Sequence, residues 1–153
     1  MIITPTTDHN IIKSIVTNPP LFKLINGQDP SCTRENYEVD TKLDYLVAES
    51  HSTYFGLISM RTITSMVVET HIRIIPYYWK TGTSIEVALH GLKWLAANTA
   101  YRKTTTTVPG NCHHVLKFLK LIDFKPCGII NDGIIYNNEL TSLIFFEKEL
   151  VRI

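Results

Sequence analysis

The sequence has no excess charge of one sign and no long apolar run. Its 15 basic and 14 acidic residues are interspersed and leave a formal net charge of +1, which gives no electrostatic case for binding nucleic acid or an anionic membrane. No apolar stretch approaches the length that spans a bilayer, and the N-terminus lacks the charged-then-apolar order of a signal peptide. We therefore expect a cytoplasmic protein with no nucleic-acid and no membrane partner.

Cysteine is also scarce. Three cysteines cannot all pair with one another, and their positions show no framework spacing, so reduced thiols are the expectation. Cys112 is followed by two histidines, but adjacent residues at the start of a helix point in different directions, and no second ligand cluster lies at zinc spacing. We expect no metal site.

What the chain does have is enough apolar sequence for one folded unit. It contains 153 residues, of which 44% are hydrophobic, so residues 1–153 are predicted to form a single domain with a sizeable core.

The most informative stretch runs from Glu69 to Asn98. Residues 67–75 are mostly β-branched or apolar and predict a strand that ends at Pro76. Ser84 is a suitable N-cap for a helix that follows, with an apolar stripe at helical spacing formed by Ile85, Ala88, Leu89, Leu92, Leu95 and Ala96. The loop between them frames the helix N-terminus, where unpaired N–H groups favour a phosphate, and Gly82 allows close approach. The alternative to a phosphate site is that this loop is an ordinary strand-to-helix turn with one glycine.

The remaining segments predict a mixed fold. Apolar spacing predicts helices over residues 11–16, 21–25 and 113–121, and β-branched content predicts strands over 43–48, 54–60, 103–108 and 142–148. A hairpin turn is expected at residues 131–133 between strands 124–130 and 134–136. Further expectations are a turn at 26–30, a loop at 31–40, and a bulge or close backbone approach at Gly56. This order predicts an α+β fold with a mainly antiparallel sheet, in which only the strands flanking the central helix are parallel.

The loop resembles the acetyl-CoA loop of the GNAT family of N-acetyltransferases, whose pattern is Pro-x-Tyr followed by Gln/Arg-x-x-Gly-x-Gly/Ala. Pro76, Tyr78 and Gly82 match it, whereas Trp79 stands where Gln or Arg is usual and Ser84 replaces the last small residue. The helix, strand, Asn and second helix that follow come in the family's order. More narrowly, Glu69-x-His71 and the segments KWLAANT and VPGN are similar to short acetyltransferases encoded by tailed bacteriophages.

The resemblance implies a GNAT-like (acyl-CoA N-acyltransferase) fold, in which the parallel central strands splay apart and the pantetheine arm enters the gap. It implies acetyl-CoA as cofactor and transfer of an acetyl group to a primary amine of a protein or small molecule. A homodimer, or a place in a phage virion, are the further partners it suggests. The implied cofactor-binding residues are Ile74, Ile75, Trp79, Lys80, Thr81, Gly82, Thr83, Ser84, Asn111 and Phe118.

Acetyl transfer requires a base for the amine, a donor to the carbonyl oxygen and a proton for the departing thiolate. Glu69 and His71 share one strand face, so we predict Glu69 as the base with His71 as its competitor or relay. The alternative is that Glu69 and His71 are simply a solvated or hydrogen-bonded polar pair and take no part in catalysis. The resemblance implies a backbone N–H of Ile74 or Ile75 as the oxygen donor, and it places Phe118 where the family's proton-donating Tyr usually stands.

Two classes of function follow. Glu69 and His71 favour an enzyme, whereas Trp79, Ser84 and Phe118 favour a non-catalytic GNAT-fold virion or interaction protein.

Overall fold

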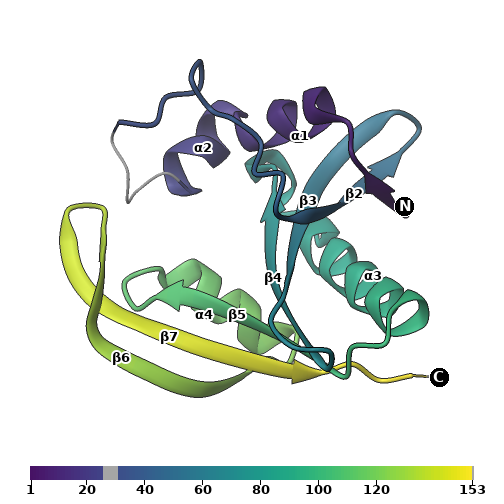
Figure 1. Ribbon diagram of the computed structural model, residues 1–153. Coiled ribbons are helices and arrows are strands. Elements are labelled where there is room, and N and C mark those ends of the chain that lie inside the picture. Colours follow the sequence, from purple (N-terminus) through teal and green to yellow (C-terminus); the bar gives the residue numbers. More distant parts are fainter. Residues whose placement is uncertain (26–30, 153) are drawn as a thin grey trace.

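One sheet organises the chain, which is described by a computed structural model over residues 1–25 and 31–152. Over these residues seven strands form the order β1-β2-β3-β4-β5-β7-β6 (Figure 1). All neighbours are antiparallel except β4 and β5. The elements in chain order are β1 (Ile2–Thr6), α1 (His9–Val16), α2 (Pro19–Ile25), β2 (Asp44–Ser50), β3 (Thr53–Thr62), β4 (Val67–Ile74), the 3-10 helix η1 (Pro76–Tyr78), α3 (Thr83–Asn98), β5 (Lys103–Pro109), α4 (His113–Leu121), β6 (Lys125–Tyr136) and β7 (Glu139–Glu149).

The parallel strands β4 and β5 splay apart. They pair only through Val67–Glu69 of β4 and Lys103–Thr105 of β5, and Figure 1 shows them diverging beyond that point. On its other edge β4 stays paired with β3 as far as Ile74. The C-terminal half of β4 therefore keeps one edge facing a gap, and the predicted α+β architecture with splayed parallel strands is confirmed.

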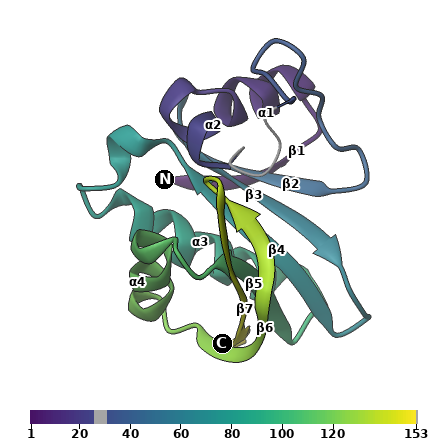
Figure 2. The same cartoon turned by 90° about the vertical axis from the view of Figure 1, so that its left-hand side faces the viewer.

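Helices cover both faces of the half of the sheet formed by β1 to β4 (Figure 2). Helices α1 and α2 pack against the face that presents Tyr45, Val47 and Leu57, while α3 contacts β1, β2, β3 and β4 on the opposite face. Ile72 and Ile74 of β4 pack on the α3 side. Because side chains alternate along a strand, the odd-numbered residues of β4 face the α1–α2 side.

Local signals set several boundaries. The carboxylate of Asp8 caps α1 by accepting from the backbone N–H groups of Asn10 at 2.9 Å and Ile11 at 3.3 Å. Helix α2 begins at Pro19, where a proline costs no helical hydrogen bond. Gly56 makes the predicted close approach, because a Cβ there would lie 2.6 Å from the carbonyl oxygen of Arg73.

Three expectations need correction. The hairpin turn is not at residues 131–133, which form a bulge inside the long strand β6; it is at Asn137 and Asn138, whose φ angles of 51° and 62° suit a type I′ turn. Helix α3 is capped by Gly82 rather than by Ser84, since it begins at Thr83. Leu89 is 43% exposed and lies outside the buried stripe. Strand β1 had no prediction, and the turn expected at 26–30 lies outside the described residues.

Candidate functional site

A cavity of about 730 Å³ lies where β4 and β5 separate. Its wall combines the end of β4, the loop before α3, β5, helix α4 and the facing side of β6. Seven of the predicted site residues line it: His71, Ile74, Trp79, Lys80, Gly82, Ser84 and Phe118. The predicted site residues that do not line it are Glu69, Ile75, Thr81, Thr83 and Asn111.

The start of α3 has the geometry of an anion site. Gly82 adopts a φ of +77°, and nothing lies within 4 Å of the position that a Cβ would occupy there. In the part of the chain that the structure describes, no side chain caps this helix end, so its first N–H groups are available to a ligand in the open space beside Gly82. Thr81 and Thr83 are engaged with each other through their hydroxyl groups at 2.8 Å.

Trp79 links the loop to two sides of the cavity. Its indole N–H donates to the carbonyl oxygen of Ile74 at 2.8 Å, and its ring stacks on His114 of α4 with a centroid distance of 5.3 Å. The residue that departs from the family's Gln or Arg is therefore anchored to β4 and α4 and presents no charge to a phosphate.

The backbone of β4 distinguishes the two predicted oxygen donors. The N–H of Ile75 donates to the carbonyl oxygen of Phe55 at 3.0 Å and is already used. Ile74 lies opposite Gly56, one step along the ladder from Ile75 and Phe55. Hydrogen-bonded and non-hydrogen-bonded pairs alternate in an antiparallel ladder, so Ile74 and Gly56 form a non-hydrogen-bonded pair. Its N–H therefore points away from β3, toward the gap.

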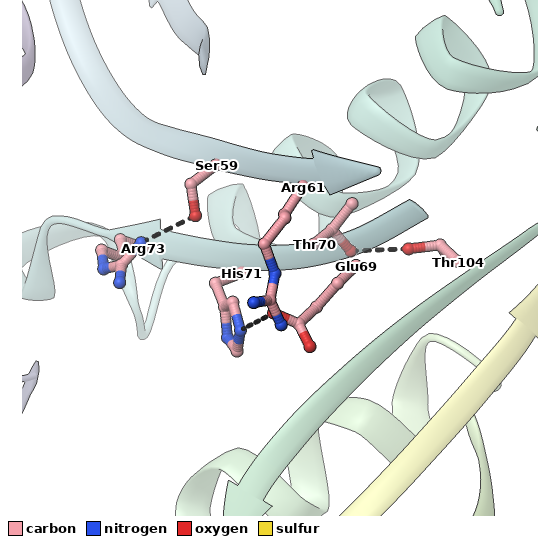
Figure 3. A network of polar contacts seen from close by, with 7 residues as sticks. All are labelled: Ser59, Arg61, Glu69, Thr70, His71, Arg73 and Thr104. Atoms are coloured by element: carbon pink, nitrogen blue, oxygen red, sulfur yellow. Dashed lines mark hydrogen bonds and ion pairs between the residues drawn. The ribbon is translucent and has the colours of Figure 1, made fainter. Parts of the chain in front are cut away.

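Glu69 and His71 are in contact, as Figure 3 shows. The Nε2 atom of His71 lies 3.4 Å from Oε1 of Glu69, and an Nη atom of Arg61 lies 3.1 Å from the same oxygen. The hydrogen bond from His71 is the main cause that lowers the pKa of Glu69, and the charge of Arg61 lowers it further, whereas burial acts the other way. Glu69 is thus an ionised partner of His71, and His71 is the one of the two that lines the cavity.

The sequence reasoning missed Arg73, which follows Glu69 and His71 on the same face of β4. Arg73 is among the residues that line the cavity, and one Nη atom donates to the hydroxyl of Ser59 at 3.0 Å (Figure 3). Burial lowers the pKa of Arg73. The alternation Glu69-x-His71-x-Arg73 was the available signal, since i, i+2 residues of a strand share a face.

Asn111 is not among the residues that line the cavity. Its amide nitrogen donates to the carbonyl oxygen of Tyr136 at 3.1 Å and approaches a carboxylate oxygen of Glu139 at 3.5 Å. The side chain thus ties the start of α4 to the β6–β7 turn, whereas a contact with the cofactor arm was expected.

Phe118 lines the cavity but supplies no proton. A hydroxyl reaches the same cavity from β6: Tyr136, whose phenol donates to the backbone carbonyl of Leu24 in α2. Burial raises the pKa of Tyr136, and nearby Cys112 raises it further. Sequence spacing gave no indication of this, because Tyr136 is distant in the chain from α4.

Residues 11–150 match the sequence family described as "Protein of unknown function (DUF2824)". The chain belongs to this DUF2824 family. No curated protein matches it by sequence. In the part of this DUF2824 chain that the structure describes, no helix is long and apolar enough to cross a membrane.

Solved structures share the fold at low sequence identity. The spermidine N-acetyltransferase of Vibrio cholerae in complex with CoA and spermine superposes with a TM-score of 0.78 at 13% identity, covering 97% of this chain and 95% of that one. A structure described as a putative phosphinothricin N-acetyltransferase gives 0.76 at 16%, covering 99% and 100%. A Streptococcus mutans UA159 protein gives 0.75 at 12%, also covering 99% and 100%. The DUF2824 chain thus has the fold of GNAT-type acetyltransferase structures.

Proposed function

We propose that this chain is an acetyl-CoA-dependent N-acetyltransferase that acetylates a primary amine of a protein or small molecule. The observation that carries the proposal is the continuity of one cavity from the N-terminus of α3, past the open edge of β4, to the imidazole of His71. The V. cholerae structure with CoA and spermine, which shares the fold, supports the same assignment.

The residues present fit a nucleotide thioester. Lys80, in the loop that holds Gly82, and Lys117 of α4 both line the cavity, and cations together with a free helix N-terminus suit a pyrophosphate. The outward N–H of Ile74 lies at the edge that a pantetheine arm would follow. Bound acetyl-CoA would supply the acetyl group as an activated thioester.

His71 is the base in this proposal, and Glu69 is its positioning residue. Imidazole changes its protonation near neutral pH, whereas a carboxylate with a lowered pKa is a weak base. With Nε2 donating to Glu69, the Nδ1 atom of His71 is left to accept the proton of the substrate ammonium. Glu69 then stabilises the imidazolium that forms, as the carboxylate does in other His–carboxylate pairs.

The transfer replaces a C–S bond by a C–N bond. With acetyl-CoA bound, the amine that His71 has deprotonated would form a C–N bond to the acetyl carbon as the C–S bond broke, and the departing sulfur would take up the second proton that the amine nitrogen loses. The N–H of Ile74 donates to the acetyl oxygen while negative charge develops on it. The products are an N-acetylated amine and free CoA.

Calorimetric titration of acetyl-CoA into the purified protein is the direct test. Wild-type protein is expected to bind saturably, and two variants are expected to lose this binding. Gly82→Trp fills the open space at the helix N-terminus, and Lys80→Glu replaces a cation by an anion while leaving the backbone unstrained. Lys42→Glu, an exposed change in the loop before β2, is the matched control and should bind like wild type.

Absence of binding at millimolar acetyl-CoA would overturn the enzyme proposal. The second candidate, a non-catalytic GNAT-fold virion or interaction protein, would then stand. Its support is Trp79, which occupies the carbonyl of Ile74 at the cofactor edge, and Phe118, which carries no hydroxyl.

A further inference from the structure

The wall of the cavity is cationic. Its charged lining residues are Arg73, Lys80 and Lys117, together with His71 and His114, and no Asp or Glu lines it among the described residues. Lys80 and Lys117 lie with the loop before α3 and with α4, on the side assigned above to the cofactor phosphates. Arg73 lies with His71 on the opposite, odd-numbered face of β4. Its positive charge is therefore not among those assigned to the cofactor phosphates.

Arg73 is incompletely paired. One Nη atom donates to Ser59, but the buried Nε–H has no hydrogen-bond partner among residues 1–25 and 31–152. Within the described residues no carboxylate lies within ion-pair distance of its guanidinium, although Arg61, Lys103, Lys125 and Lys148 all have such partners. A buried cation without a counter-charge is costly, and such groups occur where a ligand completes the pairing.

The nearest ionisable neighbours do not supply that charge. Tyr37 and Tyr45 are the groups whose fields act on Arg73. Burial raises the pKa of Tyr45 to about 12 and also raises the pKa of Tyr37, so both phenols are neutral at physiological pH. The Tyr45 hydroxyl donates to the backbone carbonyl of Asp40 at 3.0 Å.

We propose that Arg73 binds the carboxylate of the acceptor, which is a small amino-acid-type amine whose amino group lies at His71. This inference rests on the proposed acetyltransferase function and names the substrate class of the same site. Residues two apart on one strand face are separated by about 6.5–7 Å along the strand. Side chains reaching inward from these two positions hold an amine and a carboxylate of one small molecule.

The same charges disfavour a polyamine. A molecule such as spermine carries several positive charges, and a cavity whose described lining includes Arg73 and two lysines but no carboxylate repels it. This chain thus shares its fold with a structure that holds spermine but selects a different acceptor through electrostatic repulsion as well as attraction.

Matched amine pairs test the proposal on wild-type protein. Each amino acid of a panel is compared with its carboxamide and with its decarboxylated amine, for example phenylalanine with phenylalaninamide and phenethylamine, and spermine is included. Acetylation is followed by release of the CoA thiol. At least one amino acid is expected to exceed both of its partners in kcat/KM by about tenfold or more, because a site built for a carboxylate leaves Arg73 unpaired with the analogues. Equal or higher rates for the analogues that lack the carboxylate would overturn it.

Variants assign the effect to Arg73. Arg73→Gln is expected to raise KM for the preferred amino acid about tenfold or more while leaving the rate with its decarboxylated partner and the affinity for acetyl-CoA unchanged. Arg73→Lys should recover part of the loss, because a lysine keeps the charge without the planar fork. Arg102→Gln, the same change at an exposed position before β5, is the matched control.

The proposal can still be tested if Arg73→Gln does not fold or if no amine is acetylated. If Arg73→Gln fails to fold by circular dichroism, the wild-type amine pairs and Arg73→Lys carry the test alone. If acetyl-CoA binds but no amine is acetylated, the proposed function fails, and calorimetric titration of the amino-acid panel decides the present inference separately. Binding that needs the carboxylate and is weakened in Arg73→Lys supports it, and absence of such binding overturns it.

Discussion

The Nε2 atom of His71 lies 3.4 Å from Oε1 of Glu69, and only the histidine of this pair reaches the cavity wall. The carboxylate also holds Arg61 and is kept ionised by both partners. This arrangement favours His71 over Glu69 as the base of the proposed reaction, because a carboxylate whose pKa is lowered by its partners is a weak proton acceptor.

The first prediction concerns the division of labour within that pair. His71→Ala is expected to lower kcat by about 100-fold or more, the usual contribution of a positioned base, whereas Glu69→Gln is expected to lower it by about tenfold, since the amide keeps a contact but not the charge. Steady-state kinetics at saturating acetyl-CoA measure both. A larger loss for Glu69→Gln than for His71→Ala would return the base to Glu69.

The second prediction concerns acid stability. The pKa of Glu69 in the folded protein lies below its ordinary value of 4.5, so its ionised form stabilises the fold above that pH, and the contribution is lost as the pH falls through the folded pKa. Urea unfolding of wild type and Glu69→Gln should therefore differ most above pH 5 and converge toward pH 3. Glu149→Gln, at the exposed end of β7, is the control; a Glu69→Gln difference independent of pH would contradict the prediction.

A third prediction concerns the point where β4 and β5 part. The hydroxyl groups of Thr70 and Thr104 are hydrogen-bonded at 2.7 Å, and both residues are buried. Thr70→Val should lower the free energy of unfolding by about 1–3 kcal/mol because it leaves the Thr104 hydroxyl unpaired. The double variant Thr70→Val/Thr104→Val should recover much of that loss, and chemical denaturation of the full cycle measures the coupling. Additive losses would show that the two hydroxyls do not depend on each other.

The fourth prediction compares two glycines in strands. Gly56→Ala places a Cβ 2.6 Å from the carbonyl oxygen of Arg73, so β3 and β4 must move apart, at a cost of about 1–3 kcal/mol. Gly128→Ala in β6 meets nothing closer than 3.8 Å and should change the free energy of unfolding little. Thermal unfolding of both variants checks this; equal melting temperatures would contradict the close approach.

The fifth prediction concerns the missing proton donor. Phe118 lines the cavity at the position where the family resemblance expects Tyr. Phe118→Tyr is expected to raise kcat by up to about tenfold by protonating the departing thiolate, with the affinity for acetyl-CoA unchanged. Stopped-flow or steady-state kinetics with one amine acceptor measure the effect. An unchanged kcat would mean that the thiolate leaves without this acid.

Local sequence determined the elements whose signals lie within a few residues. Asp8 caps a helix as its side-chain chemistry predicts, the β-branched stretch beginning at Lys103 forms β5, and the loop before α3 places Gly82 at the helix N-terminus. The family resemblance added the fold and the splayed strands. The Asp8 cap, the β5 stretch and the position of Gly82 depend on neighbours in the chain, so one sequence suffices to predict them.

Tertiary structure decided what depends on distant partners. Strand β1 exists because it pairs with β2, and the turn after β6 lies at Asn137 and Asn138 because the register of β6 with β7 absorbs residues 131–133 as a bulge. Both are set by pairing between strands, which local propensity does not encode.

The same distinction holds in the site. The sequence placed Glu69 and His71 on one face of a strand, but the contact of Glu69 with Arg61 of the neighbouring strand and the place of His71 at the cavity are set by the tertiary structure. The sequence also contained Arg73, yet the role proposed for it comes from burial among Tyr37, Tyr45 and Ser59, with no carboxylate of the described residues at ion-pair distance. Charge and spacing are written in the sequence, whereas desolvation and pairing are created only when distant segments pack together.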